Sequence, residues 1–282
     1  MQENREQFPL AVMCQVLKVS RSGYYEWRTR QPSKQLEDKH LTQRVVALFW
    51  QGRGCYGTRR LKRLLAQEGL IVSRRRIGRL LTEQGLVCKT RKKHKPCTTD
   101  STHNHAVAPN LLDRQFTVAA PNQCYVGDIT YIDTDEGWLY LAVWIDLYAR
   151  AVVGWSMQEH MKSSLVCEAL QMAIGSPTTA PGLIIHTDRG SQYASHAFGQ
   201  LLHNHQFVAS MSRKAQCWDN AVAESFFHTL KTEQVFHQHY ATREEAKQAI
   251  FEYIEVFYNR QRLHSSNDYL SPEAFEKQCL AA

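Results

Sequence analysis

The sequence predicts an α/β fold: a mixed five-stranded sheet flanked by helices, preceded by an all-helical region. After residue 121, three segments rich in β-branched and aromatic residues follow one another across short turns, a pattern typical of antiparallel strands. Helical and strand-like segments then alternate, which indicates crossover connections within the same sheet. Before residue 100, leucines recur at helical spacing among many basic residues.

The chain has 282 residues, of which 43% are hydrophobic and 22% are charged, a composition typical of packed globular domains. Its first residues lack the basic and apolar regions of a secretory signal. The longest apolar run, residues 138–149, is too short to span a bilayer and contains Asp146. We therefore expect a cytoplasmic protein with no membrane partner.

The charge is divided sharply along the chain. Residues 1–100 hold 22 Lys and Arg against 8 Asp and Glu, whereas residues 101–282 hold 12 against 19. Basic side chains that neutralise phosphates release condensed counterions, so the first segment is suited to nucleic acid. A membrane surface is the competing polyanion, but the basic positions are not set against a face rich in Trp and Phe.

The stretch 58–86 predicts a helix-turn-helix. Apolar residues recur at helical spacing in two runs, Glu68-Gly69 separates them, and Ser73 is placed to cap the second run. Because a recognition helix inserts its N-terminal residues into the major groove, basic residues here are candidate DNA contacts. They are Arg59, Arg60, Arg74, Arg75, Arg76 and Arg79, with Lys92 and Lys93 beyond them. A solvated basic helix pair is the alternative.

A fainter copy of this pattern lies upstream, where residues 17–27 align with residues 70–80. Leu, Val, Ser and Arg match between the two segments. A second helix-turn-helix-like unit is one interpretation, and a chance match between basic helices is the other.

The segment after residue 89 is polar and lacks periodicity, as a linker does. It contains His94, Cys97, His103 and His105, whose spacing fits no common zinc finger. The eight cysteines form no C-x-x-C pair, so we expect reduced thiols. The predicted divisions are a short helical segment (1–38), a helix-turn-helix DNA-binding domain (39–92), a linker (93–120), a catalytic core (121–240) and a C-terminal helical extension (241–282).

Three carboxylates stand where the predicted strands and helices meet. Asp128 interrupts the first strand, Asp188 ends the fourth, and Glu224 lies near the start of a helix. Three anions within about 4 Å would repel one another by some kcal/mol each at an effective dielectric near 20. A divalent cation removes that penalty, and carboxylate oxygens suit Mg²⁺ or Mn²⁺. Two such ions roughly 3.5 to 4 Å apart clamp an in-line displacement at phosphorus. For any single Asp or Glu, a helix cap or surface salt bridge is the alternative.

The helix that carries Glu224 supplies a further candidate. At 100° per residue, His228 and Lys231 lie within about 40° of Glu224, with Phe226 and Leu230 on the other side. Lys231 is therefore placed to contact a phosphate beside the metal site, with a solvated lysine as the alternative.

At these residues the chain resembles a DDE transposase. The motifs are GDITY around Asp128, HTDRGSQY around Asp188, and DNAVAESFF around Glu224, with Lys231 seven positions later. The segments CYGTRRLKRLL and FYNRQRLHSSNDYLSPEAFE are similar to the N-terminal and C-terminal signatures of the insertion-sequence-three family. The resemblance spans nearly the whole chain. Two departures from the pattern are Tyr125 in place of Trp and the sequence at 267–270.

The resemblance implies a ribonuclease-H-like core similar to that of retroviral integrase. It implies Mg²⁺-dependent cleavage at insertion-sequence ends and transfer of the 3′ hydroxyl to target DNA, with Asp128, Asp188 and Glu224 as ligands of two ions and Lys231 as a DNA contact. The implied partners are the terminal inverted repeats, target DNA, and a second copy in a homodimer or larger oligomer. A helix-turn-helix and leucine-zipper protein encoded in the first frame, separate or fused, is also implied. The setting would be the bacterial cytoplasm, on the nucleoid when DNA is bound.

The segment YNRQRLH admits two interpretations. A phosphate-contacting helix end makes Arg262 a DNA contact, whereas a tyrosine recombinase would use Tyr258 as nucleophile. The tyrosine precedes the basic residues here and a second arginine cluster is missing, which disfavours the recombinase. For the whole chain, the rival functions are a DNA-binding regulator with a non-catalytic core and a structure-selective nuclease of the same fold.

Overall fold

The computed structural model describes residues 1–89, 107–175, 179–214 and 216–280. They form two compact units, Met1–Cys88 and Lys89–Ala282. The predicted DNA contacts Lys92 and Lys93 lie outside the described residues, as do the His and Cys residues at 94–105. Within the described part, no helix combines the length and apolar character needed to cross a membrane.

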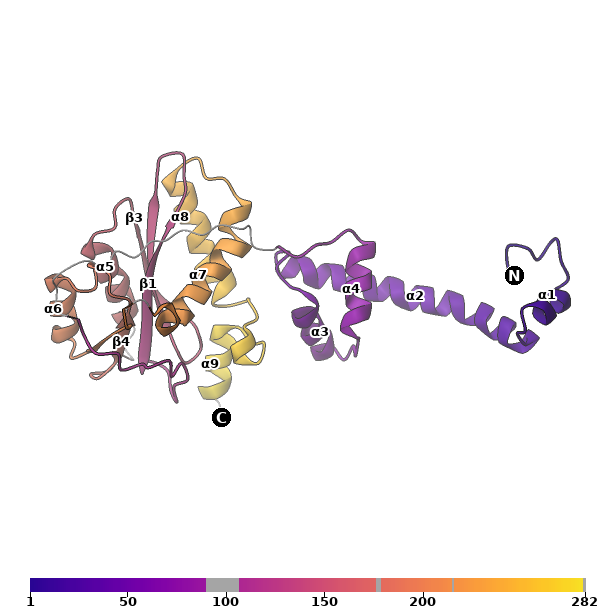
Figure 1. Ribbon diagram of the computed structural model, residues 1–282, viewed down its shortest axis with the longest axis horizontal. Coiled ribbons are helices and arrows are strands. Elements are labelled where there is room, and N and C mark those ends of the chain that lie inside the picture. Colours follow the sequence, from indigo (N-terminus) through magenta and orange to yellow (C-terminus); the bar gives the residue numbers. More distant parts are fainter. Residues whose placement is uncertain (90–106, 176–178, 215, 281–282) are drawn as a thin grey trace. The chain divides into compact units, whose positions relative to one another are not determined.

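The first unit is entirely helical (Figure 1). Its helices are α1 (Leu10–Val16), α2 (Arg21–Gln51), α3 (Thr58–Gln67) and α4 (Arg74–Glu83). Both α3 and α4 contact α2 and each other. Val45, Leu48 and Phe49 of α2 are buried, as the core of this three-helix arrangement requires. Because α2 is one continuous helix, the predicted division between residues 38 and 39 falls inside it.

The helix-turn-helix predicted at 58–86 is confirmed in α3 and α4. Leu61 and Leu65 are fully buried on α3, and Ile77 is fully buried on α4. The turn contains Gly69 at φ +79°, a left-handed conformation that favours glycine. Ser73 caps α4 by accepting a hydrogen bond from the Arg76 backbone N–H at 3.2 Å.

The upstream copy shares the serine cap, although its left-handed residue lies two positions before the cap, whereas Gly69 lies four positions before Ser73. Lys18 follows α1 in a left-handed turn at φ +51°. Ser20 then caps α2, because its hydroxyl accepts a hydrogen bond from the Gly23 backbone N–H at 3.0 Å. The aligned serines, Ser20 and Ser73, thus each cap the second helix of a helix-turn-helix-like pair.

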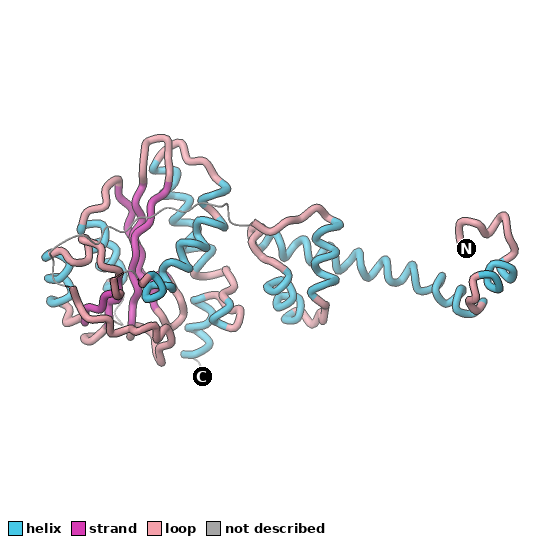
Figure 2. The backbone as a smooth tube through the Cα atoms, viewed as in Figure 1, coloured by secondary structure: helices cyan, strands magenta, loops and turns pink. Residues whose placement is uncertain are grey.

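The second unit is built on a mixed sheet, which confirms the predicted fold class (Figure 2). The order across the sheet is β3-β2-β1-β4-β5. The first three strands form antiparallel pairs, and β4 and β5 are parallel to β1. The strands are β1 (Cys124–Ile132), β2 (Leu139–Asp146), β3 (Val152–Gln158), β4 (Ile184–Thr187) and β5 (Val208–Met211).

Helices cover both faces of this sheet (Figure 1). One face packs against α5 (Ser163–Ile174) and α6 (His196–Asn204), and α7 (Ala221–Glu233) contacts β1 and β2 on the other. The chain then continues through α8 (Arg243–Glu252), a π-helix (Tyr253–Tyr258) and α9 (Pro272–Leu280). A 3₁₀ turn, Cys217–Asn220, leads directly into α7.

The core explains why Gly127 precedes Asp128. Trp144 on β2 lies opposite Gly127 and stacks on Phe198 of α6 at 5.8 Å between ring centroids. A Cβ atom on Gly127 would lie 2.4 Å from the Trp144 ring. The indole therefore needs a glycine beside it, and the next residue, Asp128, projects to the opposite face.

Part of the predicted linker belongs to the second unit. Leu112 is buried, and the Leu111 backbone N–H donates a hydrogen bond to the Ser210 hydroxyl at 2.9 Å. The segment is irregular, as its lack of periodicity predicted, but a few apolar and polar anchors still attach it to β5.

Candidate active site

Asp128 and Asp188 meet because of the register between two parallel strands. Val126 on β1 pairs with His186 on β4. The same register, continued by two residues, sets Asp128 beside Asp188, which directly follows the end of β4. Neighbouring strands lie about 4.8 Å apart, so two carboxylates in register on one face are close neighbours. Each is fixed by a backbone N–H: Ile129 donates to Asp128 at 2.8 Å and Gly190 donates to Asp188 at 2.9 Å.

The start of α7, which carries Glu224, is anchored beside Asp128. The Asn220 side chain donates a hydrogen bond to the Gly127 carbonyl at 3.1 Å, and Asn220 is buried. Asp219 is fully buried and accepts hydrogen bonds from the side chains of Arg213, Arg114 and Asn110 at 2.7 to 3.0 Å. These arginine contacts hold the pKa of Asp219 well below its usual range.

The pKa of the Asp128 carboxyl is shifted in the opposite direction to that of Asp219. Burial raises its pKa well above the usual value, and the neighbouring Asp188 and, less strongly, Glu224 raise it further. The Ile129 N–H and Lys231 oppose this shift without cancelling it. Asp128 and Asp188 thus form a site of two neighbouring carboxylates, in which the charge of one raises the pKa of the other.

Glu224 and Lys231 face this site from α7. The Glu224 side chain is exposed, yet partial removal of water from its carboxyl group raises the pKa. The Lys231 ammonium lies 4.6 Å from the centre of the Tyr131 ring. Burial lowers the pKa of Lys231, and the charge of Asp128 opposes that shift. As predicted, Phe226 and Leu230 are buried on the other side of the helix.

The donor set suits a hard divalent cation, because carboxylate oxygens are the ligands that Mg²⁺ and Mn²⁺ prefer. In the described part of the chain, however, no three His, Cys, Asp or Glu side chains are arranged to hold one ion. Asp128 and Asp188 come together, whereas Glu224 acts on Asp128 only through its weaker electrostatic effect. A complete ligand set would require the exposed Glu224 side chain to turn toward the pair.

Tyr193 is a site residue that the sequence reasoning missed. Burial raises the pKa of its phenol, and so do the charges of Asp128 and Asp188. Its hydroxyl is buried and has no hydrogen-bond partner among the described residues. Its position five residues after Asp188, within the HTDRGSQY motif, was the available signal.

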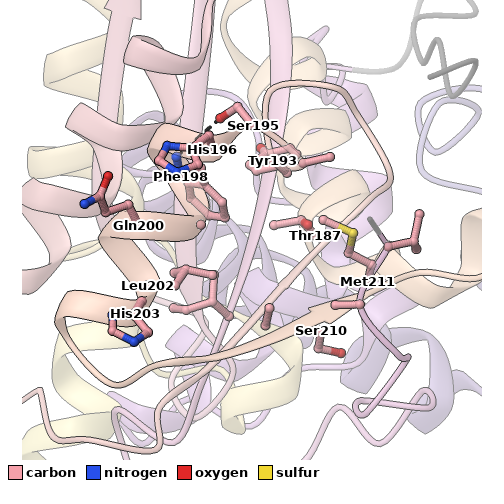
Figure 3. Close-up of a pocket in the computed structure, with 16 residues that line it drawn as sticks. Thr187, Tyr193, Ser195, His196, Phe198, Gln200, Leu202, His203, Ser210 and Met211 are labelled. Carbon is pink, nitrogen blue, oxygen red and sulfur yellow. Dashed lines mark hydrogen bonds between the residues drawn. The ribbon is translucent and has the colours of Figure 1, made fainter. Parts of the chain in front are cut away.

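A cavity of about 620 Å³ lies behind Tyr193, between α6 and strands β4 and β5. Phe198, Leu202 and Met211 give it an apolar lining, with polar groups such as His196 near its edge (Figure 3). None of the three carboxylates lines it. The cavity is therefore distinct from the acidic site.

The predicted DNA-contacting arginines of the first unit differ in the contacts that their guanidinium groups make within the unit. Arg59 and Arg75 are exposed, and neither forms an ion pair among the described residues. Arg76 and Arg79 both pair with Asp38 of α2. The other two make neutral contacts: Arg74 donates to the Thr58 hydroxyl and Arg60 to the Cys55 carbonyl.

Arg262 requires a correction. The sequence predicted a DNA contact, but the side chain is 6% exposed and forms a two-pronged ion pair with Glu233, with N···O distances of 2.7 and 2.8 Å. Tyr253 donates to the same carboxylate at 2.9 Å. The guanidinium is thus enclosed and neutralised inside the unit, where DNA does not reach it. Tyr258 is also buried, which removes the basis for a recombinase nucleophile there.

Comparison with known families agrees with this architecture. Models described as integrase core domain match residues 118–217 and 224–280, and a model of an HTH-like domain matches residues 35–94. Together with the strand order, these matches confirm the predicted ribonuclease-H-like core. The chain is an integrase-core protein with an N-terminal helix-turn-helix-like domain.

Two relatives narrow this class. Transposase InsF for insertion sequence IS3A of Escherichia coli (strain K12) is 43% identical over 283 residues, covering 99% of this chain and 98% of the relative. The uncharacterized 31 kDa protein of insertion element IS600 of Shigella sonnei is 46% identical over 267 residues, covering 94% and 98%. The chain belongs to the IS3 family of insertion-sequence transposases.

Solved structures include similar chains at low identity. A chain of the simian T-cell lymphotropic virus intasome in complex with PP2A regulatory subunit B56 gamma gives a TM-score of 0.47 at 16% identity, covering 76% of this chain and 70% of that chain. The HTLV-2 integrase catalytic core domain in complex with magnesium gives 0.43 at 17% identity, covering 56% and 97%.

Proposed function

We propose that this chain cuts DNA at the ends of an insertion sequence and joins the freed 3′ hydroxyl to target DNA. The observation that carries the proposal is the pairing in register of Asp128 with Asp188, where burial and the neighbouring carboxylate raise the pKa of Asp128. Glu224 completes the proposed ligand set by turning in from α7. Bound Mg²⁺ or Mn²⁺, one ion or two, would supply charge neutralisation and an activated water or hydroxyl.

In the first step, water attacks a phosphodiester at the element end, the bond from phosphorus to the 3′ oxygen breaks, and that oxygen leaves as a hydroxyl. In the second step, this hydroxyl attacks a target phosphodiester and displaces another 3′ oxygen. The three carboxylates would hold the cations beside the reacting phosphate, and Lys231 contacts a neighbouring phosphate. No covalent protein intermediate is required.

Binding of element ends falls to the first unit. The guanidinium of Arg75, near the N-terminus of α4, is exposed and forms no ion pair with any described residue, which supports a role in the major groove. Arg59, Arg60, Arg74, Arg76 and Arg79 would contact phosphates around it, together with Lys92 and Lys93. Two ends must be joined in one event, so the active form would be a homodimer or larger assembly, with a first-frame protein as a further partner.

Labelled element-end DNA incubated with the protein and Mg²⁺ tests the proposal. We expect joined product from the wild type, and none from Asp188→Asn, which should still bind DNA. Asp133→Asn removes an exposed carboxylate just beyond β1 and should behave as the wild type. Cut product without joining would indicate a nuclease, and bound DNA without cutting would indicate a regulator; either result contradicts the proposal.

A further inference from the structure

A second, smaller cavity of about 180 Å³ lies on the flank of α7, around the helix from the three carboxylates. It is enclosed by α7, the turn between β2 and β3, and the loop that follows the π-helix. Its lining contains no Asp or Glu. Its polar residues are Arg150, Ser225, Thr229, His264 and Ser266, set around an apolar floor that includes Phe226 and Tyr258.

The Arg150 guanidinium has an unused donor. Its Nη2 donates a hydrogen bond to the Phe116 carbonyl at 2.7 Å, which fixes the orientation of the group. Its Nη1 is buried and has no hydrogen-bond partner among the described residues. No carboxylate in the described part of the chain forms an ion pair with it. Buried donors are nearly always satisfied in native proteins, so this unmet donor makes Arg150, which lines the cavity, the candidate to bind an acceptor that enters it.

The backbone at Arg150 is strained and held from both sides. Its φ of +60° is uncommon for any residue other than glycine. The Asn259 side chain bonds both backbone groups of Val152, at 3.0 and 2.9 Å, and the Asn267 side chain donates to the Ala149 carbonyl at 2.6 Å. Strain that neighbours enforce in this way is typical of functional positions. The YNRQRLHSSN segment thus serves to present Arg150.

The rim of the cavity is suited to an oxyanion. Ser225 and Ser266 are exposed, and Thr229 and His264 are half-buried, so hydroxyl groups surround an opening to solvent. The Ser266 backbone N–H donates to Nδ1 of His264 at 3.3 Å, so the neutral ring carries its proton on Nε2. Hydroxyl and guanidinium donors, with no acidic residue among them, favour an anion over a cation or a sugar.

We propose that this cavity binds one phosphate group of the DNA backbone, with Arg150 as its charged donor and the hydroxyls of Ser225 and Thr229 beside it. The proposal deepens the function proposed above and rests on it. Ser225 follows Glu224 on a helix about 10 Å wide, and a DNA strand carries one phosphate per 3.4 Å of axis. The bound phosphate is therefore about three nucleotides from the one that is cleaved.

The salt dependence of DNA binding, measured in EDTA so that no cleavage occurs, is the first test. Arg150→Gln should weaken binding by about tenfold and lower the slope of log K against log salt by about one. Arg150→Lys should keep the slope but lose part of the affinity, because lysine retains the charge without the fork of donors. Arg260→Gln removes an exposed guanidinium that pairs with Glu273 and serves as the matched control. An unchanged slope for Arg150→Gln, or an equal change for Arg260→Gln, overturns the proposal.

A scan with singly substituted methylphosphonate DNA locates the contact. We expect one position, about three nucleotides from the cleaved bond, where the neutral substitution weakens binding by the wild type but not by Arg150→Gln. Inorganic phosphate at matched ionic strength tests the other source of this anion. Competition by millimolar phosphate without a sensitive position in the scan would make the cavity a free-anion site and overturn the assignment to DNA.

Loss of folding in Arg150→Gln is checked by thermal unfolding. If that variant unfolds, Ser225→Ala combined with Thr229→Val carries the test, with an expected loss of about three- to fivefold at the same position of the scan. Failure of the proposed function is a separate result, since a chain that binds DNA without cutting it still reports on the cavity. A chain that cuts and joins with an unaltered Arg150→Gln slope contradicts only the cavity proposal.

Discussion

The second unit contains two acidic sites in which the carboxyl pKa is shifted in opposite directions. Asp219 accepts hydrogen bonds from two arginines, and its pKa is lowered. Asp128 lies beside Asp188, and its pKa is raised. Both sites are built from carboxylates of the same unit, but arginines lower the pKa of Asp219, whereas burial and a neighbouring carboxylate raise that of Asp128.

The difference distinguishes a carboxylate that stabilises the fold from a pair of carboxylates suited to bind a ligand. A carboxylate that the protein neutralises contributes to folding and leaves nothing for a ligand. A pair that the protein crowds together costs folding free energy, and such a cost is typical of sites that need a ligand for their charge. The same contrast holds between Arg262, which Glu233 satisfies, and Arg150, whose Nη1 has no partner in the described chain.

The largest expected effect is that of Asp128→Asn. Cleavage with Mg²⁺ should fall by more than about a thousandfold, because the site loses one carboxylate of its proposed ligand set. In EDTA the melting temperature should be equal to or above that of the wild type, since the substitution removes a crowded charge. Added Mg²⁺ should raise the melting temperature of the wild type and not of the variant. A destabilised Asp128→Asn in EDTA would break the comparison between the two acidic sites.

Asp219→Asn, in contrast, should destabilise the folded protein. Loss of charge-assisted hydrogen bonds to Arg213 and Arg114 should lower the melting temperature at pH 7 by roughly 5 to 10 °C. The folded-state pKa of Asp219 is depressed, so its contribution to stability is present above the ordinary carboxyl pKa of 3.8 and is lost as the pH falls through the folded-state pKa. Urea unfolding of both proteins should therefore converge in acid. Constant separation from pH 7 to pH 2 would contradict this assignment.

The smallest expected effects compare two arginines of the first unit, one exposed and one paired with an aspartate. Arg75→Gln should weaken binding to element-end DNA by about three- to tenfold and reduce the salt slope by about one, because its charge is free. Arg76→Gln should change the slope less, since Asp38 already pairs with that guanidinium. Fluorescence anisotropy over a salt series measures both. Equal slopes for the two variants would show that the pairing with Asp38 does not persist on DNA.

Much of the fold could be predicted because its signals are local. Leucine spacing and the Ser73 cap give α3 and α4, and the alternation of residues from 124 onward gives the first three strands. Asp128 and Asp188 could be expected to converge because one interrupts a predicted strand and the other ends one. The helices, the caps and the strands themselves depend on residues within a few positions of one another.

The long helix α2 and the packed part of the linker were harder to predict. Nothing local marks residue 38 as a helix interior, and it is Asp38, through Arg76 and Arg79, that joins this part of α2 to α4. Residues 107–120 lack periodicity, and their attachment depends on single contacts such as that between Leu111 and Ser210. Sparse tertiary contacts of this kind leave no repeating pattern.

By itself the sequence determined the elements, the order of the motifs and the family to which they belong, because periodicity, caps and short signatures are written in neighbouring residues. Only the tertiary structure decided which charges are satisfied. Arg262 pairs with Glu233 across 29 positions and Arg114 pairs with Asp219 across 105, whereas Arg150 donates to the Phe116 carbonyl and pairs with no carboxylate of the described residues. Electrostatic free energy depends on distance in space and on access to water, and the fold alone sets both.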